Sequence, residues 1–207
     1  MRDLKIEDLP LEGIRAVVFD VDGTLYDKRH LAFWLIVCDL PHVLYLAAER
    51  VCRRQLSGRC FGSEASFYDV LFSRIARYLP VSKQKVERWY FQNYMPGMVS
   101  IIAKRYTVGS FLAPLLEELH KRGLRVAVFS DYCYVDEKLS ALGVDPESFD
   151  YRFCSAQFGG LKPARDVFAG VLQEMSVKPE EALMIGDKES TDGAGAASVG
   201  MRFVLAK

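Results

Sequence analysis

The sequence predicts an α/β fold, namely a doubly wound parallel sheet of Rossmann-like architecture with an all-helical domain inserted into it. Three short apolar runs, at 15–20, 124–129 and 182–185, have the length and composition of strands that are buried on both faces. Amphipathic stretches alternate with the later runs, and this alternation is typical of parallel sheets covered by helices. One long interruption, at 28–108, contains no strand-like run. We therefore expect a sheet-containing core and a helical insertion.

The remaining elements of the core follow from helical spacing and from residues that begin helices. One helix is expected at 111–120, before the second strand, and two more at 134–142 and 164–175, between the second and third strands. Pro163 stands at the first turn of the last of these helices, where its fixed φ angle is favourable. A final apolar run at 202–205 predicts a fourth strand, so strands and helices alternate to the end of the core.

The inserted segment differs from the rest of the chain in texture and in charge. Apolar residues recur in it at helical spacings, which predicts about four helices. It carries 13 basic and 5 acidic residues, a balance of +8, while the rest of the 207-residue chain carries −8. The neutral total argues against a protein built to coat nucleic acid. We expect a core domain at 1–27 and 109–207 and an inserted helical domain at 28–108.

The arginines of the inserted segment leave two interpretations open. In one, some of them face a cleft and steer an anionic substrate, or a lipid surface, toward it. In the other, they lie on the outer face of the insertion and balance the acidic core across the interface between the two domains. The residues concerned are Arg50, Arg53, Arg54, Arg74, Arg77 and Arg88.

Nothing in the sequence marks the chain for export. Its N-terminal residues include several acids and lack an apolar core of signal-peptide length. The cysteines are odd in number and show no metal-binding spacing, so we expect reduced thiols in a cytoplasmic protein. They are Cys38, Cys52, Cys60, Cys133 and Cys154.

The stretch from Leu31 to Ala48 is apolar enough to raise the question of a membrane span. Asp39, Pro41 and His42 lie near its middle. A charged group is costly in lipid and proline interrupts a helix, so we expect a buried or partner-facing helix pair and no stable membrane insertion.

Four acidic residues follow two of the predicted strands. Asp20 and Asp22 come at the end of the first strand, where an extended backbone directs both side chains to the same side. Neighbouring carboxylates repel each other unless a proton or a cation lies between them. Asp187 follows the strand at 182–185, and with Asp192 it would complete an oxygen-rich site suited to Mg²⁺. The sequence therefore predicts a metal site in which one carboxylate remains usable as a nucleophile, formed by Asp20, Asp22, Asp187 and Asp192.

Groups that can bind a phosphate stand near the same edge of the predicted sheet. Ser130 follows the second strand and offers a hydroxyl, and backbone N–H groups near Asp131 can join it. Pro163 biases Lys162 toward an extended backbone, from which its ammonium can act on a phosphate or on the nucleophilic carboxylate. Gly23 permits a tight turn beside the acidic pair. We expect phosphate binding by Gly23, Ser130, Asp131 and Lys162.

In order and spacing, these residues resemble the four motifs of the haloacid dehalogenase-like (HAD) hydrolase superfamily. The motifs are Asp20-Val-Asp22-Gly-Thr-Leu25, Ser130, Lys162-Pro163, and Gly186-Asp187 with Asp192. The resemblance covers the chain from residue 15 to its end. It implies the phosphatase branch of the superfamily, in which the insertion after the first motif is a helical cap that closes over the site and selects the substrate.

The resemblance also implies a mechanism, in which Asp20, Asp22 and Lys162 are the catalytic residues. Asp20 would attack phosphorus and form an aspartyl-phosphate, while Asp22 would protonate the leaving alcohol and later activate water. Ser130 and Lys162 would hold the transferring phosphoryl oxygens. The expected enzyme is a Mg²⁺-dependent phosphatase acting on a small phosphorylated metabolite.

For the metal, the resemblance implies that Asp187 binds Mg²⁺ together with Asp20 and the backbone carbonyl of Asp22, with Asp192 assisting. Similar enzymes that cleave carbon–halogen bonds lack the second aspartate, because a halide leaves without a proton, so Asp22 favours phosphoryl transfer. The chain departs from many family phosphatases at Asp131, where Asn or Gly is common. This departure places an additional negative charge near the phosphate site.

Two other functions are open to a chain with these residues. A phosphomutase of the same family shares all of them and differs in retaining its product. A membrane-associated binding or assembly protein on the same scaffold would use the apolar stretch at 31–46 instead. A binding protein would not need to keep all four of Asp20, Asp22, Lys162 and Asp187, so their presence argues for an enzyme. No nucleic-acid partner is expected, and the sequence does not specify an oligomeric state.

Overall fold

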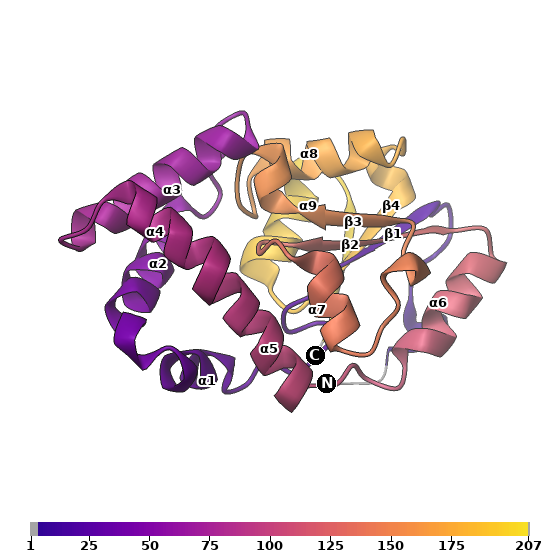
Figure 1. The fold of residues 1–207 in the computed structure, drawn as a ribbon. Helices are drawn as coiled ribbons and strands as arrows, with labels where there is room; N and C mark the ends of the chain where they lie inside the picture. The colour runs from indigo at the N-terminus through magenta and orange to yellow at the C-terminus, as the bar shows by residue number, and fades with distance from the viewer. Residues whose placement is uncertain (1–3, 207) are drawn as a thin grey trace.

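A computed structural model describes residues 4–206 and contains a five-stranded sheet with helices on both faces (Figure 1). All neighbouring strands are parallel, so their carboxyl ends lie at one edge of the sheet. This arrangement confirms the predicted doubly wound α/β fold. In spatial order β3-β2-β1-β4-β5, the strands are β1 (Ala16–Phe19), β2 (Arg125–Ser130), β3 (Tyr151–Cys154), β4 (Ala182–Gly186) and β5 (Arg202–Leu205).

The central strand β1 is buried on both faces and joins two apolar clusters. Val17 and Phe19 belong to one cluster, and Ala16 and Val18 belong to the other, as the two-residue repeat of a strand requires. Helices α6 (Leu112–Lys121) and α7 (Val135–Ala141) cover the first face, and α8 (Arg165–Glu174) and α9 (Ala194–Val199) cover the second (Figure 1).

Between 31 and 105 the chain forms helices and no strand. Apolar side chains of this segment, such as Phe67, Phe72 and Trp89, belong to the same cluster as Phe19 of β1, so the helical segment packs on the core. Figure 1 shows α5 running beside α7 at this junction. The helices are α1 (Leu31–Cys38), α2 (Val43–Leu56), α3 (Glu64–Tyr78), α4 (Lys83–Trp89) and α5 (Met95–Arg105), with a π-helical turn at Tyr90–Tyr94 between the last two.

Two cysteines differ from the sequence prediction. The structure joins Cys133 and Cys154 in a disulfide with a Cα–Cα distance of 5.1 Å, so the expectation of five reduced thiols is wrong for this pair. Cys133 follows β2 and Cys154 ends β3, and these neighbouring parallel strands bring their carboxyl ends together. Cys38, Cys52 and Cys60 are free thiols.

The apolar stretch after β1 folds as a bent helix pair. Among residues 4–206, no single helix has both the length and the apolar character needed to cross a bilayer. Helix α1 and the helical segment Leu40–Leu56 meet that test only when taken together, and they are bent by 101° where they join.

Candidate active site

Lys162 occupies the centre of a buried cluster at the carboxyl edge of the sheet. Its ammonium donates hydrogen bonds to Asp20 Oδ1 at 2.9 Å, to Asp192 Oδ1 at 2.9 Å and to the carbonyl oxygen of Phe129 at 2.7 Å. The Lys162 side chain is 2 % exposed, and both carboxylates are buried with it. One cation thus holds two acids that come from different strand ends.

Asp20 is placed by the sheet and held by a second donor. Its backbone N–H donates to the carbonyl of Ile185 at 2.8 Å, which extends the pairing of β1 with β4 by one residue. The Thr24 hydroxyl donates to Asp20 Oδ2 at 2.9 Å, so each oxygen of the carboxylate has one fixed partner. The carboxylate is therefore oriented in advance of substrate binding.

Asp22 lies in a separate network formed by three donors. Its Oδ2 accepts hydrogen bonds from the Ser130 hydroxyl at 2.8 Å and from the Lys138 ammonium at 2.6 Å, and its Oδ1 accepts from the Tyr26 hydroxyl at 2.7 Å. Lys138 also donates to Ser130 Oγ at 2.9 Å. The Lys138 side chain is completely buried, so its charge depends on Asp22 for compensation.

The two aspartates next to β1 have opposite pKa shifts. The pKa of Asp20 is raised to about 6, because burial and the nearby Asp192 and Asp22 carboxylates raise it by more than Lys162 lowers it. Burial also acts to raise the pKa of Asp22, but the charge and hydrogen bond of Lys138 outweigh it and lower that pKa. The two carboxyl groups therefore differ in how readily each loses its proton.

A candidate metal site lies between Asp20, Asp187 and Asp192, whose carboxylate oxygens are within 4.8 Å of one another. The sequence prediction also included Asp22, but its carboxylate is not part of this cluster and turns toward Lys138 instead. The backbone carbonyl of Asp22 does face a cation, because Lys28 Nζ lies 2.5 Å from it and 2.7 Å from Asp187 Oδ2.

Gly23 makes this approach possible. It has a φ angle of +106°, and a Cβ atom at this position would collide with Asp187 Oδ2 and come within 2.6 Å of Lys28 Nζ. The predicted tight turn is present, and it leaves room for a carboxylate and a cation beside the backbone.

The side chain of Asp131 contacts the backbone of Lys162. Its carboxylate oxygen Oδ1 accepts a hydrogen bond from the backbone N–H of Lys162 at 3.0 Å, so the side chain fixes the segment that carries Lys162. The Asp131 carbonyl accepts from Arg53 Nη1 at 3.0 Å. The carboxylate of Asp131 thus binds the Lys162 backbone, and its carbonyl connects the sheet edge to the helical segment.

The arginines of the helical segment divide into two groups. Arg53 is buried, donates to Glu49 Oε1 at 2.6 Å and to the Tyr90 hydroxyl at 2.8 Å, and stacks over the ring of Tyr132. Through Asp131 and Tyr132, Arg53 connects the helical segment 31–105 to the core. Of the others, Arg50, Arg54, Arg77 and Arg88 are exposed and Arg74 is half-buried.

Sequence reasoning missed three side chains of the site. Lys138 stands in a helix next to acidic residues and carries no signal beyond that of a solvated lysine. Tyr26 and Lys28 follow the first motif closely, and only that proximity to Asp22 could have indicated them. All three approach Asp22, two through its carboxylate and one through its carbonyl.

Replacing Lys138 by Met is expected to reduce kcat/KM for phosphate release roughly ten- to a hundredfold, within the range typical of lost acid–base control. The substitution removes the cation that lowers the pKa of Asp22, so the pH at which activity appears should rise. A pH–rate profile measures both effects. Lys83→Met, at an exposed ion pair with Asp69, is the matched control. An unchanged profile in Lys138→Met would show that Lys138 has no part in catalysis.

The chain is similar to known phosphatases in sequence and to a known dehalogenase in fold. A glyceraldehyde 3-phosphate phosphatase of Methanothermobacter thermautotrophicus is 28% identical over 93% of this chain and 85% of its own. A ribulose-1,5-bisphosphate 5-phosphatase of Halopiger xanaduensis is 27% identical over 92% of this chain and 83% of its own. The fold is similar to that of 2-haloacid dehalogenase from Pseudomonas syringae pv. Tomato DC3000, with a TM-score of 0.64 at 20% identity over 93% of this chain and 86% of that one.

The match to a family description covers most of the molecule. Residues 14–200 fit the description "haloacid dehalogenase-like hydrolase", a span that begins just before β1 and ends after α9. It includes every acidic and basic residue of the buried cluster at the sheet edge. The chain belongs to the haloacid dehalogenase-like hydrolase family.

Proposed function

We propose that the protein is a Mg²⁺-dependent phosphatase that hydrolyses a small phosphorylated metabolite through an aspartyl-phosphate. The observation that carries the proposal is the buried ion pair of Lys162 with Asp20. It orients a carboxylate at the sheet edge and places a cation beside it. The two similar phosphatases are named for small phosphorylated substrates, which supports this substrate class.

The residues present fit a Mg²⁺ ion. Three carboxylate oxygens lie close enough to share one cation, and the Lys28 ammonium demonstrates that a positive charge is accommodated between Asp187 and the Asp22 carbonyl. Asp20, Asp187 and the Asp22 carbonyl would hold the ion, with Asp192 next to them. When bound, Mg²⁺ would neutralise the phosphate and the carboxylates around it.

In the first half of the proposed reaction, an Asp20 oxygen forms a bond to phosphorus as the bond from phosphorus to the leaving oxygen breaks. Asp22 in its protonated form gives the leaving oxygen a proton and becomes a carboxylate, and Ser130 and Lys162 hold the other phosphoryl oxygens. In the second half, Asp22 takes a proton from water, which attacks phosphorus and releases phosphate from Asp20. Lys138 favours the ionised form of Asp22 and so supports the second half most directly.

The proposed cap, 28–108, would choose the substrate. Its buried Arg53 reaches the carbonyl of Asp131, one residue from Ser130, so movement of the cap is transmitted to the phosphate-binding loop. In this proposal the protein is cytoplasmic, where phosphorylated metabolites occur.

A panel of phosphomonoesters tests the function. The full-length protein is incubated with triose phosphates, sugar bisphosphates and a generic phosphomonoester, with Mg²⁺ or with EDTA, and released phosphate is measured. We expect Mg²⁺-dependent release from at least one small sugar phosphate. Isomerised substrate without phosphate release would identify a phosphomutase. No conversion of any substrate would contradict both enzymes and favour the membrane-associated binding protein.

A further inference from the structure

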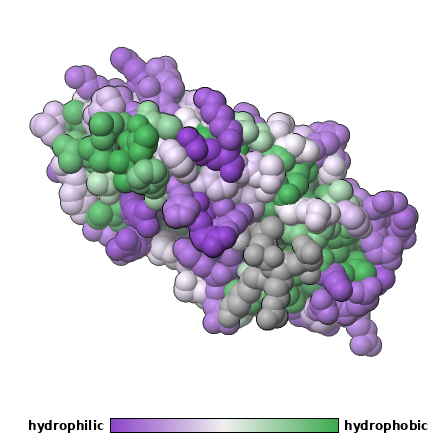
Figure 2. All heavy atoms as spheres, turned by 90° about the horizontal axis from the view of Figure 1, so that it is seen from below, coloured by the Kyte–Doolittle hydropathy of each residue, from purple (hydrophilic) through white to green (hydrophobic). Residues whose placement is uncertain are grey.

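Helix α1 and the start of α2 present an apolar surface to solvent. Helix α1 has no charged residue, and only Leu31 of its eight residues is buried. A helix that is apolar on all sides is normally enclosed by protein or by lipid. Figure 2 shows a large apolar patch toward one end of the molecule, among other smaller ones. We define the apolar face as Phe33, Ile36, Val37, Leu40 and Leu44, which are 41–66% exposed.

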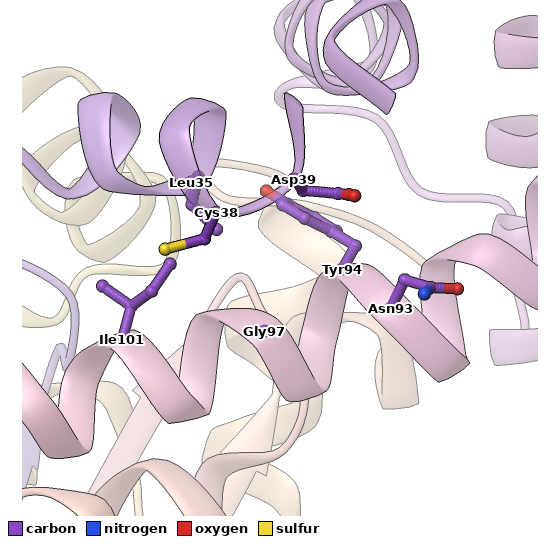
Figure 3. Close-up of a pocket in the computed structure, with 7 residues that line it drawn as sticks. All are labelled: Leu35, Cys38, Asp39, Asn93, Tyr94, Gly97 and Ile101. Carbon is purple, nitrogen blue, oxygen red and sulfur yellow. The ribbon is translucent and has the colours of Figure 1, made fainter. Parts of the chain in front are cut away.

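Packing beneath the apolar face is incomplete. A cavity of about 130 Å³ lies between α1 and the helical stretch formed by the π-helical turn Tyr90–Tyr94 and α5. Figure 3 shows Leu35, Cys38, Tyr94 and Ile101 around it. Asp39 also lines this cavity, but its carboxylate accepts a hydrogen bond from Trp89 Nε1 at 2.9 Å and pairs with His42 at 2.6 Å. The one acid of the stretch is therefore paired within the protein, and the outward surface stays uncharged.

Exposed basic groups precede and follow the apolar face along the chain. At the start of α1, an open hollow of about 610 Å³ is lined by Arg29, His30, Trp34, Lys104 and Arg105, among others. The Arg105 guanidinium lies 3.3 Å from the centroid of the Trp34 ring. Among the basic residues of this hollow, Asp27 forms an ion pair with Arg29. At the far end, on α2, the exposed basic residues are Arg50 and Arg54.

We propose that the apolar face docks on the surface of a membrane that contains anionic lipid. An apolar helix surface edged by tryptophan and by basic side chains is the composition that binds at a lipid interface. The bend of 101° between the two helices suits a segment that lies on a bilayer better than one that crosses it. A second copy of the chain is less suitable, because a two-fold contact through this face would bring its basic borders together.

Vesicle sedimentation tests the docking surface. We expect the wild type to sediment with phosphatidylcholine vesicles that contain phosphatidylglycerol, to bind pure phosphatidylcholine less, and to dissociate as salt is raised. The triple variant Phe33→Ser, Leu40→Ser, Leu44→Ser should lose at least about tenfold in binding, since its apolar contact area is removed. Tyr78→Ser, an equally exposed aromatic on α3, is the matched control and should bind as the wild type does.

Three results would overturn the proposal. The first is a wild type that stays in the supernatant with anionic vesicles, and the second is a triple variant that binds as well as the wild type. The third is concentration-dependent self-association that the triple variant abolishes, without vesicle binding, which would identify a second copy as the partner. Circular dichroism of each variant establishes that the fold is retained.

A second inference concerns Lys28 and rests on the proposed Mg²⁺ site. Its ammonium contacts Asp187 Oδ2 and the Asp22 carbonyl, which are two of the oxygens proposed to bind the ion. An ammonium and a Mg²⁺ ion cannot both occupy that position, because each needs the same lone pairs and the two cations repel. We infer that Lys28 is a tethered cation that Mg²⁺ must displace, so that it weakens metal binding by this chain.

Calorimetric titration with MgCl₂, without substrate, tests this inference. Lys28→Met retains the length of the side chain and removes its charge, and it should bind Mg²⁺ about fivefold more tightly, which corresponds to the loss of one partly exposed ion pair. Lys121→Met, at an exposed ion pair with Glu117, should not change the affinity. Asp187→Asn should weaken binding in both backgrounds, which places the ion at this site.

Equal or weaker Mg²⁺ binding by Lys28→Met would overturn the inference about Lys28. It is also wrong if neither protein binds Mg²⁺, whatever the activity of the wild type. Conversely, tighter binding by Lys28→Met together with no hydrolysis of any phosphomonoester would support the inference and contradict the proposed function. The two claims therefore fail through different measurements.

Discussion

Asp20→Asn is expected to reduce phosphate release by at least about a thousandfold, because an amide cannot serve as the attacking nucleophile. The amide oxygen can still accept the Lys162 hydrogen bond, and the amide NH₂ would face the Thr24 hydroxyl, which can turn to accept from it, so the geometry of the site should persist. The loss should appear in kcat, measured with the best substrate of the phosphomonoester panel at saturating Mg²⁺. It should not be recovered at any pH.

The same substitution is expected to leave stability unchanged or to increase it. The folded pKa of Asp20, about 6, lies above its ordinary value of 3.8, so at neutral pH the ionised carboxylate opposes folding. An acid with a raised pKa loses stability as the pH rises through that interval, and Asn removes this loss. Thermal unfolding at pH 7 without Mg²⁺ measures the effect.

The control for Asp20→Asn is Asp166→Asn, an exposed acid in the first turn of α8. This variant should retain full activity. If Asp20→Asn retained more than a small fraction of wild-type activity, another group would be the nucleophile. If it retained none but also unfolded at a much lower temperature, the loss would reflect structure, and the assignment would fail on the second measurement.

The sequence was sufficient to predict the buried strands of the sheet. Strands β1, β2 and β4 are fully or almost fully buried, and strands of that kind form continuous apolar runs that can be recognised without other information. The polar residues that end them identified the edge where the site lies. Parallel strands place their carboxyl ends together, so residues from motifs far apart in the chain could be grouped by sequence alone.

Strand β3 was missed because a charged residue interrupts its short apolar pattern. It has four residues, and its Arg152 is half-exposed and pairs with Asp136 and Glu147. An edge strand has only one neighbour and tolerates such a charged side chain. The other edge strand, β5, has its arginine at the first position and keeps an unbroken apolar run after it, so it was predicted. The same strand carries Cys154, and without it the proximity of Cys154 to Cys133 could not be inferred.

Lys138 shows a second limit of sequence reasoning. A lysine in a short helix with two preceding acids is normally solvated, and helical periodicity assigns it no role. Its burial is caused by tertiary packing, which brings α7 against the end of β1 so that the ammonium meets Asp22. Contacts of this kind depend on the path of the chain after Ser130. That path cannot be predicted from the local pattern of apolar and polar residues.

Lys162→Met is expected to have the largest combined effect on stability and activity. The substitution keeps most of the side-chain volume but removes the cation shared by Asp20 and Asp192, and it leaves the Phe129 carbonyl without its donor. Breaking a buried ion pair by removing one partner typically costs about 3–5 kcal/mol, so the melting temperature should fall by several degrees. Phosphate release should fall at least about a hundredfold, because the charge beside the nucleophile is lost.

A double variant separates the electrostatic cause from simple loss of packing. Adding Asp192→Asn to Lys162→Met removes one of the two carboxylates that lost their partner, so much of the melting temperature should be recovered. Activity should not recover, because Asp20 still lacks Lys162. A double variant no more stable than Lys162→Met would show that the lysine acts through its packing. A stable and active Lys162→Met would contradict its place in the site, since nothing else among the described residues supplies a buried cation to both Asp20 and Asp192.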